Sequence, residues 1–134
     1  MTVVRRMRCE VRVSIPATLE ALEEFFAMLR GNRLMPCAGD FGAELLLRET
    51  MTNAVVHGCR NDASKQVRCV LRVKDGRLII AVVDDGEGFD WQAASRHRSE
   101  GQDISGRGME ILQAYSTRVR FNARGNAVAI LKRL

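Results

Sequence analysis

The sequence of 134 residues predicts an α/β fold. Apolar residues recur at helical spacing in 17–30 and 40–57. In the segments before and after these stretches, apolar residues alternate with polar ones or form unbroken runs, as they do in strands. A hydrophobic share of 46% is enough to build a core without disulfide or metal cross-links. We therefore expect one domain, residues 1–134, with helices packed on a sheet.

The first half of the chain predicts one strand and two helices. In 7–13, apolar residues alternate with charged ones, which is the pattern of a strand with one buried face. In 17–30, leucines and phenylalanines recur at helical spacing with glutamates between them. A second helix begins near Asp40, a plausible N-cap, and runs to about His57, where Gly58 can end it.

The second half predicts a hairpin, a long irregular segment and a closing hairpin. Strands at 67–73 and 78–83 are separated by Asp75-Gly76, which favours a tight turn, and the unbroken apolar run 78–83 is typical of a central strand. Residues 84–105 show no sustained periodicity of apolar residues and form a long segment for a simple connection inside a compact domain. The remaining elements are a short helix at 108–115 and strands at 119–121 and 127–131.

Charge and cysteine content narrow the class of protein. The net charge of +5 permits a nucleic-acid partner, but the arginines mostly alternate with apolar residues along predicted strands, as on a solvated sheet face. The four cysteines form no C-x-x-C pair, which fits reduced thiols better than a disulfide framework or a zinc site. Without an apolar run long enough for a membrane span or a signal peptide, we expect a cytoplasmic protein with no membrane or direct nucleic-acid partner.

Three motifs carry the chemistry. Glu49, Asn53 and His57 are spaced i, i+4, i+8 and therefore share one face of the second helix, although a solvated helix face would show the same spacing. The segment 84–88, Asp-Asp-Gly-Glu-Gly, directly follows the apolar strand, and 106–109, Gly-Arg-Gly-Met, opens the third helix. Alone, each glycine cluster could be an ordinary turn or loop.

In this order the motifs resemble the N, G1 and G2 boxes of the GHKL ATPases, the superfamily of gyrase, histidine kinases and anti-sigma serine kinases. The boxes are E-x-x-x-N-A at 49–54, D-x-G-x-G at 84–88 and G-x-G-L/M/F at 106–109. The run T-N-A-V-V-H-G, the short lid and the small size look like the anti-sigma-factor serine/threonine kinases. The resemblance implies a two-layer α/β sandwich of the Bergerat type, with a mixed, mostly antiparallel sheet and helices on one face.

The resemblance also implies ATP and Mg²⁺ as ligands and gives the main site residues their roles. Asp84 would accept a hydrogen bond from the adenine amine, while Gly86 and Gly88 let the backbone approach base and ribose. Asn53 would be the metal ligand, and Glu49, one turn earlier, would orient or deprotonate an incoming hydroxyl.

The G2 box is expected to bind the phosphates. Gly106 and Gly108 precede a predicted helix, whose free amide groups favour the β and γ phosphates. Ser105 and Met109 flank these glycines as further nucleotide-binding candidates, and Arg107 adds a charge at a variable position of the motif. His57 is either a phosphate contact or a structural residue near the helix end. In the lid, 89–105, Arg96 and Arg98 are either solvated charges or contacts to phosphate or partner.

The leading functional hypothesis is an anti-sigma factor that is also a serine/threonine kinase. The resemblance implies a sigma factor and a STAS-type anti-anti-sigma protein as partners, and a possible homodimer. A nucleotide-gated binding module without catalysis is an alternative, as is the catalytic domain of a histidine kinase. Against the latter, the chain has only two histidines and no upstream helical hairpin to carry an accepting one. A nucleic-acid binder ranks last because aromatic residues for base stacking are few.

Overall fold

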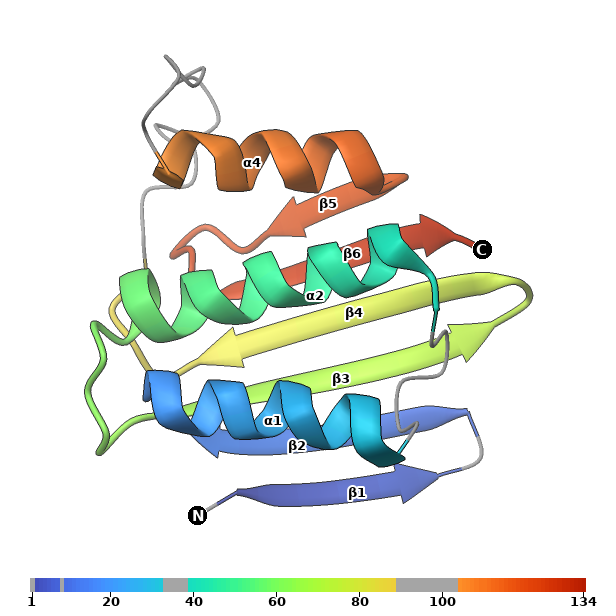
Figure 1. The fold of residues 1–134 in the computed structure, drawn as a ribbon. Helices are drawn as coiled ribbons and strands as arrows, with labels where there is room; N and C mark the ends of the chain where they lie inside the picture. Colours follow the sequence, from blue (N-terminus) through green and yellow to red (C-terminus); the bar gives the residue numbers. More distant parts are fainter. Residues whose placement is uncertain (1, 8, 33–38, 89–103) are drawn as a thin grey trace.

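The protein is described here from a computed structural model that defines residues 2–7, 9–32, 39–88 and 104–134 (Figure 1). It is a two-layer α/β sandwich: the helices cover one face of a six-stranded sheet with strand order β1-β2-β3-β4-β6-β5. The strands are β1 Val3–Met7, β2 Glu10–Pro16, β3 Gln66–Lys74, β4 Arg77–Asp84, β5 Arg118–Phe121 and β6 Ala127–Arg133. The helices are α1 Leu19–Asn32, α2 Phe41–Thr52, the π-helical η1 Asn53–Gly58 and α4 Ile104–Tyr115.

The predicted fold class is confirmed. Every pairing between the described strands is antiparallel, so the sheet contains none of the parallel pairs that a mixed sheet would have among these residues. In the part of the chain that the structure describes, no helix combines the length and apolarity that a membrane span requires.

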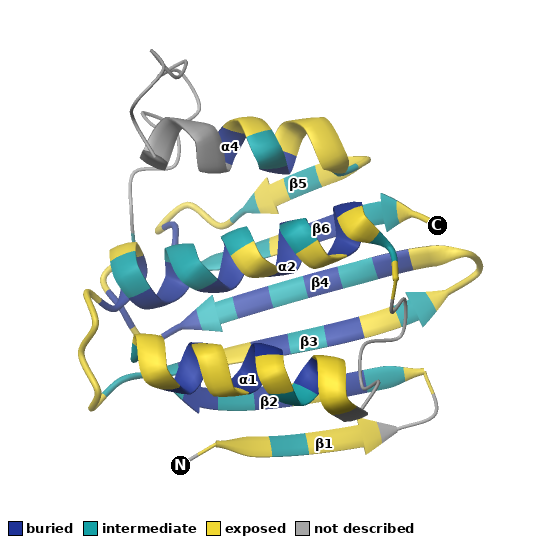
Figure 2. Ribbon diagram, viewed as in Figure 1, coloured by how far each residue is buried: buried dark blue, intermediate teal, exposed yellow. Residues whose placement is uncertain are grey.

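The core lies between the helices and the inward side of the sheet (Figure 2). In β3 and β4, alternate residues are buried, because successive side chains of a strand point to opposite faces. Phe25 of α1 and Leu46 of α2 are fully buried and meet this face from above. The largest completely buried side chains also include Ile15, Leu47, Met51, Leu71, Leu78, Ile80, Leu112 and Ile130.

The N-terminal segment differs from the prediction. In place of one strand at 7–13, the chain forms the antiparallel pair β1 and β2, with Val4 opposite Val13 and Met7 opposite Glu10. The alternation of apolar and charged residues runs without a break from Met7 to Val13, across the reversal, and no glycine or proline marks it. Periodicity alone therefore could not reveal the turn between them.

The second helix changes its hydrogen-bonding pattern within the N box. Asp40 caps α2 as predicted, accepting a hydrogen bond from the Ala43 amide at 3.0 Å. From Asn53 the helix continues as η1, in which the Cys59 amide donates to the Ala54 carbonyl five residues back, at 2.8 Å. Such π-helical turns are rare and are often found at functional sites.

The pairing of the strands brings the end of β4 and the start of β6 to the same end of the sheet. The turn Asp75-Gly76 has positive φ at both residues, 52° and 71°, as the predicted tight hairpin requires. β4 returns from this turn through the middle of the sheet and ends at Asp84. Because β6 runs antiparallel to β4, with Val83 opposite Ala127, the start of β6 lies beside the end of β4.

Candidate functional site

Asp84 is a buried carboxylate at the end of a central strand. It is 5% exposed, and its Oδ1 atom accepts a hydrogen bond from the Gly86 amide at 2.8 Å and a longer one from Cys59 Sγ at 3.9 Å. Burial raises the pKa of Asp84, the Gly86 hydrogen bond opposes that rise, and the charge of Asp85 adds to it. No donor among the described residues reaches Oδ2, which leaves this oxygen able to accept from a ligand.

Two glycines create the space that this carboxylate occupies. A Cβ on Gly58, at the end of η1, would lie 2.6 Å from Asp84 Oδ2. A Cβ on Gly86 would lie 1.9 Å from the Gly58 carbonyl oxygen. The last residue of the N-box helix and the first glycine of the G1 box are therefore in direct contact, and no larger residue fits at either position without a shift.

The second glycine of the G1 box has a different constraint. Gly88 has φ +92°, a conformation that favours glycine, and its added Cβ would lie 1.9 Å from the Arg124 carbonyl oxygen. The Arg124 guanidinium also donates to the Glu87 carbonyl at 3.3 Å. The G1 loop thus rests on the turn between β5 and β6.

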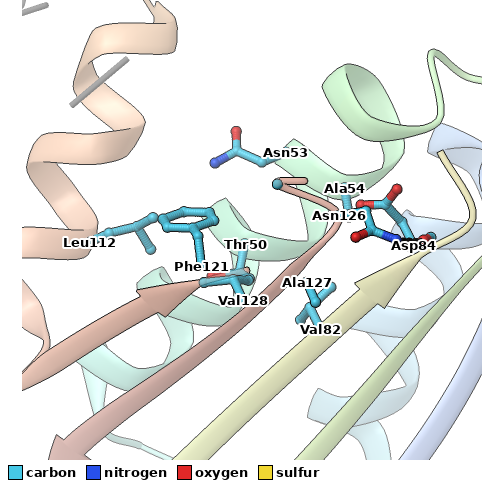
Figure 3. A pocket seen from close by; sticks show the side chains of 11 residues that line it. Thr50, Asn53, Ala54, Val82, Asp84, Leu112, Phe121, Asn126, Ala127 and Val128 are labelled. Carbon is cyan, nitrogen blue, oxygen red and sulfur yellow. Dashed lines mark hydrogen bonds between the residues drawn. The ribbon is translucent and has the colours of Figure 1, made fainter. Parts of the chain in front are cut away.

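A cleft opens between the helices and this end of the sheet (Figure 3). Asp84 lines it from β4 and Asn53 lines it from the first residue of η1. The other walls are largely apolar and come from both layers: Thr50, Ala54, Val82, Leu112, Phe121, Gly125, Asn126, Ala127 and Val128. The structure therefore brings the key residues of the N and G1 boxes to one cavity.

Glu49 lies one helical turn before Asn53 and is half-buried. Burial raises the pKa of Glu49, and the neighbouring Arg48 guanidinium offsets part of the increase. A carboxylate with a raised pKa is a better proton acceptor than a free one, as a general base requires. Glu49 is not part of the cleft wall, so its role in transfer stays a prediction.

His57 does not reach the cleft. It is exposed near the end of η1, where bonding from i to i+5 still leaves residues i and i+4 on the same side of the helix. Both alternatives for His57, a phosphate contact and a structural role, therefore stay predictions.

The G2 box lies within a helix rather than before it. α4 begins at Ile104, so the backbone of Ser105, Gly106, Arg107 and Gly108 belongs to its first turns. Amide groups of a first helical turn lack intrahelical partners, so those of Ser105 and Gly106 are free for phosphate, whereas the Gly108 amide lies in the second turn and bonds within the helix, contrary to the expectation that it precedes the helix. Met109 is buried, 6% exposed, and packs in the core. The lid residues Arg96 and Arg98 lie outside the described residues.

Sequence reasoning missed the contribution of the closing hairpin. Phe121 and Asn126 line the cleft, although the sequence marks them only as a strand residue and a turn residue. Their position follows from the pairing of β6 with β4, which local periodicity does not contain. The Gly125-Asn126 turn was the one available signal, since such a pair between two short strands locates a hairpin.

The residues present fit an adenine nucleotide and its metal. A flat apolar ring suits the aliphatic and aromatic walls, and the buried Asp84 carboxylate suits the adenine amine, because binding pockets combine apolar walls with a few polar groups. The Asn53 side chain offers the amide oxygen that Mg²⁺ accepts as a ligand.

Comparison with known proteins agrees with this geometry. One solved structure that matches is the histidine kinase domain of the blue-light-activated histidine kinase EL346 from Erythrobacter litoralis, with a TM-score of 0.52 and 27% sequence identity. The similarity covers 69% of this chain and 43% of that one, so the chain spans less than half of that chain's length. No curated protein sequence matches.

The family profile of the histidine kinase-like ATPase domain matches residues 15–132, which is most of the chain. The match includes the N box on α2 and η1, the G1 box after β4 and the G2 box in α4. With the buried carboxylate and the cleft in the places that these boxes imply, the chain belongs to the histidine kinase-like ATPase family and is a GHKL-type ATP-binding domain.

Proposed function

We propose that this domain is an anti-sigma factor and a protein serine/threonine kinase, which transfers the γ-phosphate of ATP to a STAS-type anti-anti-sigma protein. Within the superfamily, the run T-N-A-V-V-H-G favours this subfamily. A sigma factor is then the second partner, and a cytoplasmic homodimer is the expected working form.

The observation that supports the proposal is that two polar side chains line one cleft and a third, outside its wall, lies one helical turn from one of them. Asp84 is buried at its floor, Asn53 lines its helical wall, and Glu49 lies one turn before Asn53 with a raised pKa. A site that only bound nucleotide would need the first two residues. The half-buried carboxylate of Glu49 supplies the additional group that accepting a proton would require.

The transfer step follows from these groups. Glu49 accepts the proton of a serine or threonine hydroxyl, the hydroxyl oxygen bonds to the γ-phosphorus, and the bond to the β–γ bridging oxygen breaks to release ADP. Asn53 would hold Mg²⁺, which neutralises charge on the phosphates when bound. Asp84 would orient the base, and the free amide groups at the start of α4 would bind the phosphates.

Intact-mass measurement tests the proposal. Incubation with MgATP and a candidate STAS acceptor should add one phosphate to the acceptor. Glu49→Ala should keep ATP affinity and slow transfer by about 10²- to 10⁴-fold, the usual contribution of a general base. Glu44→Ala, which removes an exposed glutamate from the same helix, is the matched control. Full transfer by Glu49→Ala would remove Glu49 from the mechanism, and no transfer by the wild type would favour a binding module.

The similarity to a histidine kinase domain favours one second candidate, the catalytic domain of a histidine kinase. The two candidates differ in the bond that they make. A phosphoserine or phosphothreonine ester survives acid, whereas the phosphoramidate of phosphohistidine is hydrolysed by it. Radiolabel on the acceptor that disappears in acid and persists in alkali would therefore establish the histidine kinase instead.

A further inference from the structure

Asn126 occupies a special position beside the base pocket. It lines the cleft next to Asp84, and Figure 3 shows the two side chains close together at the edge of the sheet. Its backbone carbonyl accepts a hydrogen bond from the Asp84 amide at 2.9 Å. This bond extends the β4–β6 ladder by one step beyond the last strand pair, Val83 opposite Ala127.

The other half of that step is made by a side chain. In an antiparallel ladder, a hydrogen-bonded pair exchanges two backbone bonds, so the Asn126 amide would normally donate to the Asp84 carbonyl. Here the Asn126 amide donates instead to Asn122 Oδ1 at 3.1 Å. The Asn126 side-chain Nδ2 replaces it and donates to the Asp84 carbonyl oxygen at 3.2 Å.

The turn fixes this substitution in place. Asn122 Oδ1 accepts from the backbone amides of Gly125, Asn126 and Ala127 at 2.8, 3.1 and 3.2 Å. The Asn122 Nδ2 group in turn donates to Asn126 Oδ1 at 2.6 Å. Both ends of the Asn126 amide therefore have partners, and its Nδ2 group faces the Asp84 backbone.

We infer that Asn126 is a positioning residue of the base pocket, which holds the backbone of Asp84 so that the carboxylate stands where an adenine amine can meet it. The 122–126 turn then controls base selectivity without donating to the nucleotide itself. Adenine presents an amine donor where guanine presents a carbonyl acceptor, so a displaced Asp84 should weaken ATP more than GTP. The inference rests on ATP binding in this cleft.

The test is the ratio of ATP to GTP affinity, measured by calorimetry with Mg²⁺ on the full chain. Asn126→Ala removes the neutral hydrogen bond to the Asp84 carbonyl together with the one that Asn126 Oδ1 accepts from Asn122. It should raise the Kd for ATP by about 3- to 10-fold, with a smaller change for GTP. Asn126→Asp keeps the bond from Asn122 but sets an oxygen against the Asp84 carbonyl. Its loss of ATP affinity should be larger.

A matched control lies at the opposite end of the same hairpin. Thr117, the residue before β5, accepts through Oγ1 from the Arg133 amide of β6 at 3.3 Å, so Thr117→Ala also removes a side-chain-to-backbone bond, away from the cleft. It should change thermal stability but not the ATP to GTP ratio. Equal ratios in Asn126→Ala, Thr117→Ala and the wild type would overturn the inference.

Asp84→Asn separates this outcome from a failure of nucleotide binding. If Asp84→Asn loses ATP affinity while Asn126→Ala keeps both affinity and selectivity, the positioning role alone is refuted. If the wild type binds no adenine nucleotide, the proposed function fails first. Circular dichroism verifies folding, and if Asn126→Ala does not fold, the nearly isosteric Asn126→Asp provides the same comparison.

Discussion

Replacing Gly58 with alanine would insert one methyl group between the N-box helix and the G1 carboxylate. The added Cβ would lie 2.6, 2.8 and 2.9 Å from Oδ2, Cγ and Oδ1 of Asp84, whereas ordinary contacts begin near 3.4 Å. The carboxylate must therefore move by about 0.5 to 0.8 Å, since η1 and its buried neighbours hold the helix side in place.

Two opposing effects decide the stability of Gly58→Ala. Alanine is favoured over glycine in helices by about 1 kcal/mol, and overpacking a buried site costs about 1 to 3 kcal/mol. We expect a net loss of about 0 to 2 kcal/mol in the free energy of unfolding. The larger effect should be on ATP, because a hydrogen bond to a charged group is worth about 1.5 to 3 kcal/mol, or about 10- to 150-fold in Kd.

Calorimetry with MgATP measures the affinity of Gly58→Ala, and guanidinium unfolding measures its stability. Gly31→Ala is the matched control, because a Cβ there meets nothing within 4 Å and the position lies in α1. The control should keep wild-type affinity, with a stability change below about 1 kcal/mol. If Gly58→Ala binds ATP as tightly as Gly31→Ala, the carboxylate of Asp84 is not what holds the nucleotide.

Other perturbations test the electrostatics and the loop. Burial raises the pKa of Asp84 in the folded state, so ionisation of this carboxyl lowers the stability of the fold as pH rises from the ordinary pKa of 3.8 through the raised one. Thermal scans should therefore show that Asp84→Asn is more stable than the wild type at neutral pH, and that the difference disappears toward pH 3. The same variant should lose ATP affinity. The rate of phosphoryl transfer by the wild type should fall on acidification while the pH is still above 4.5, because the pKa of Glu49 is raised from that ordinary value. If the acidic side of the pH–rate profile is unchanged in Glu49→Gln, another group is responsible for it. Gly88→Ala places a Cβ against the Arg124 carbonyl at a residue with positive φ. The ATP affinity of this variant should fall by about 10-fold or more, and its midpoint of urea unfolding should drop. Wild-type values for both would mean that the loop rearranges freely.

The sequence predicts some elements of the molecule correctly and misses others. The hairpin of β3 and β4 was predicted with its turn because Asp75-Gly76 is a local signal with a specific backbone requirement. The reversal between β1 and β2 was missed because the same alternation continues through it. The change to a π-helix at Asn53 was missed as well, since hydrogen bonding to the fifth residue leaves no mark in an apolar pattern.

The sequence by itself determined the class of fold and the order of three motifs, because period, turn residues and glycine clusters are local properties. Only the tertiary structure decided that Gly58 and Gly86 touch, and that Asn126 reaches Asp84 across the sheet. These contacts join residues far apart in the chain, and they depend on the pairing of β6 with β4 and on the packing of η1 over the strand ends. A pocket whose walls come from both layers can therefore be identified only from the tertiary structure.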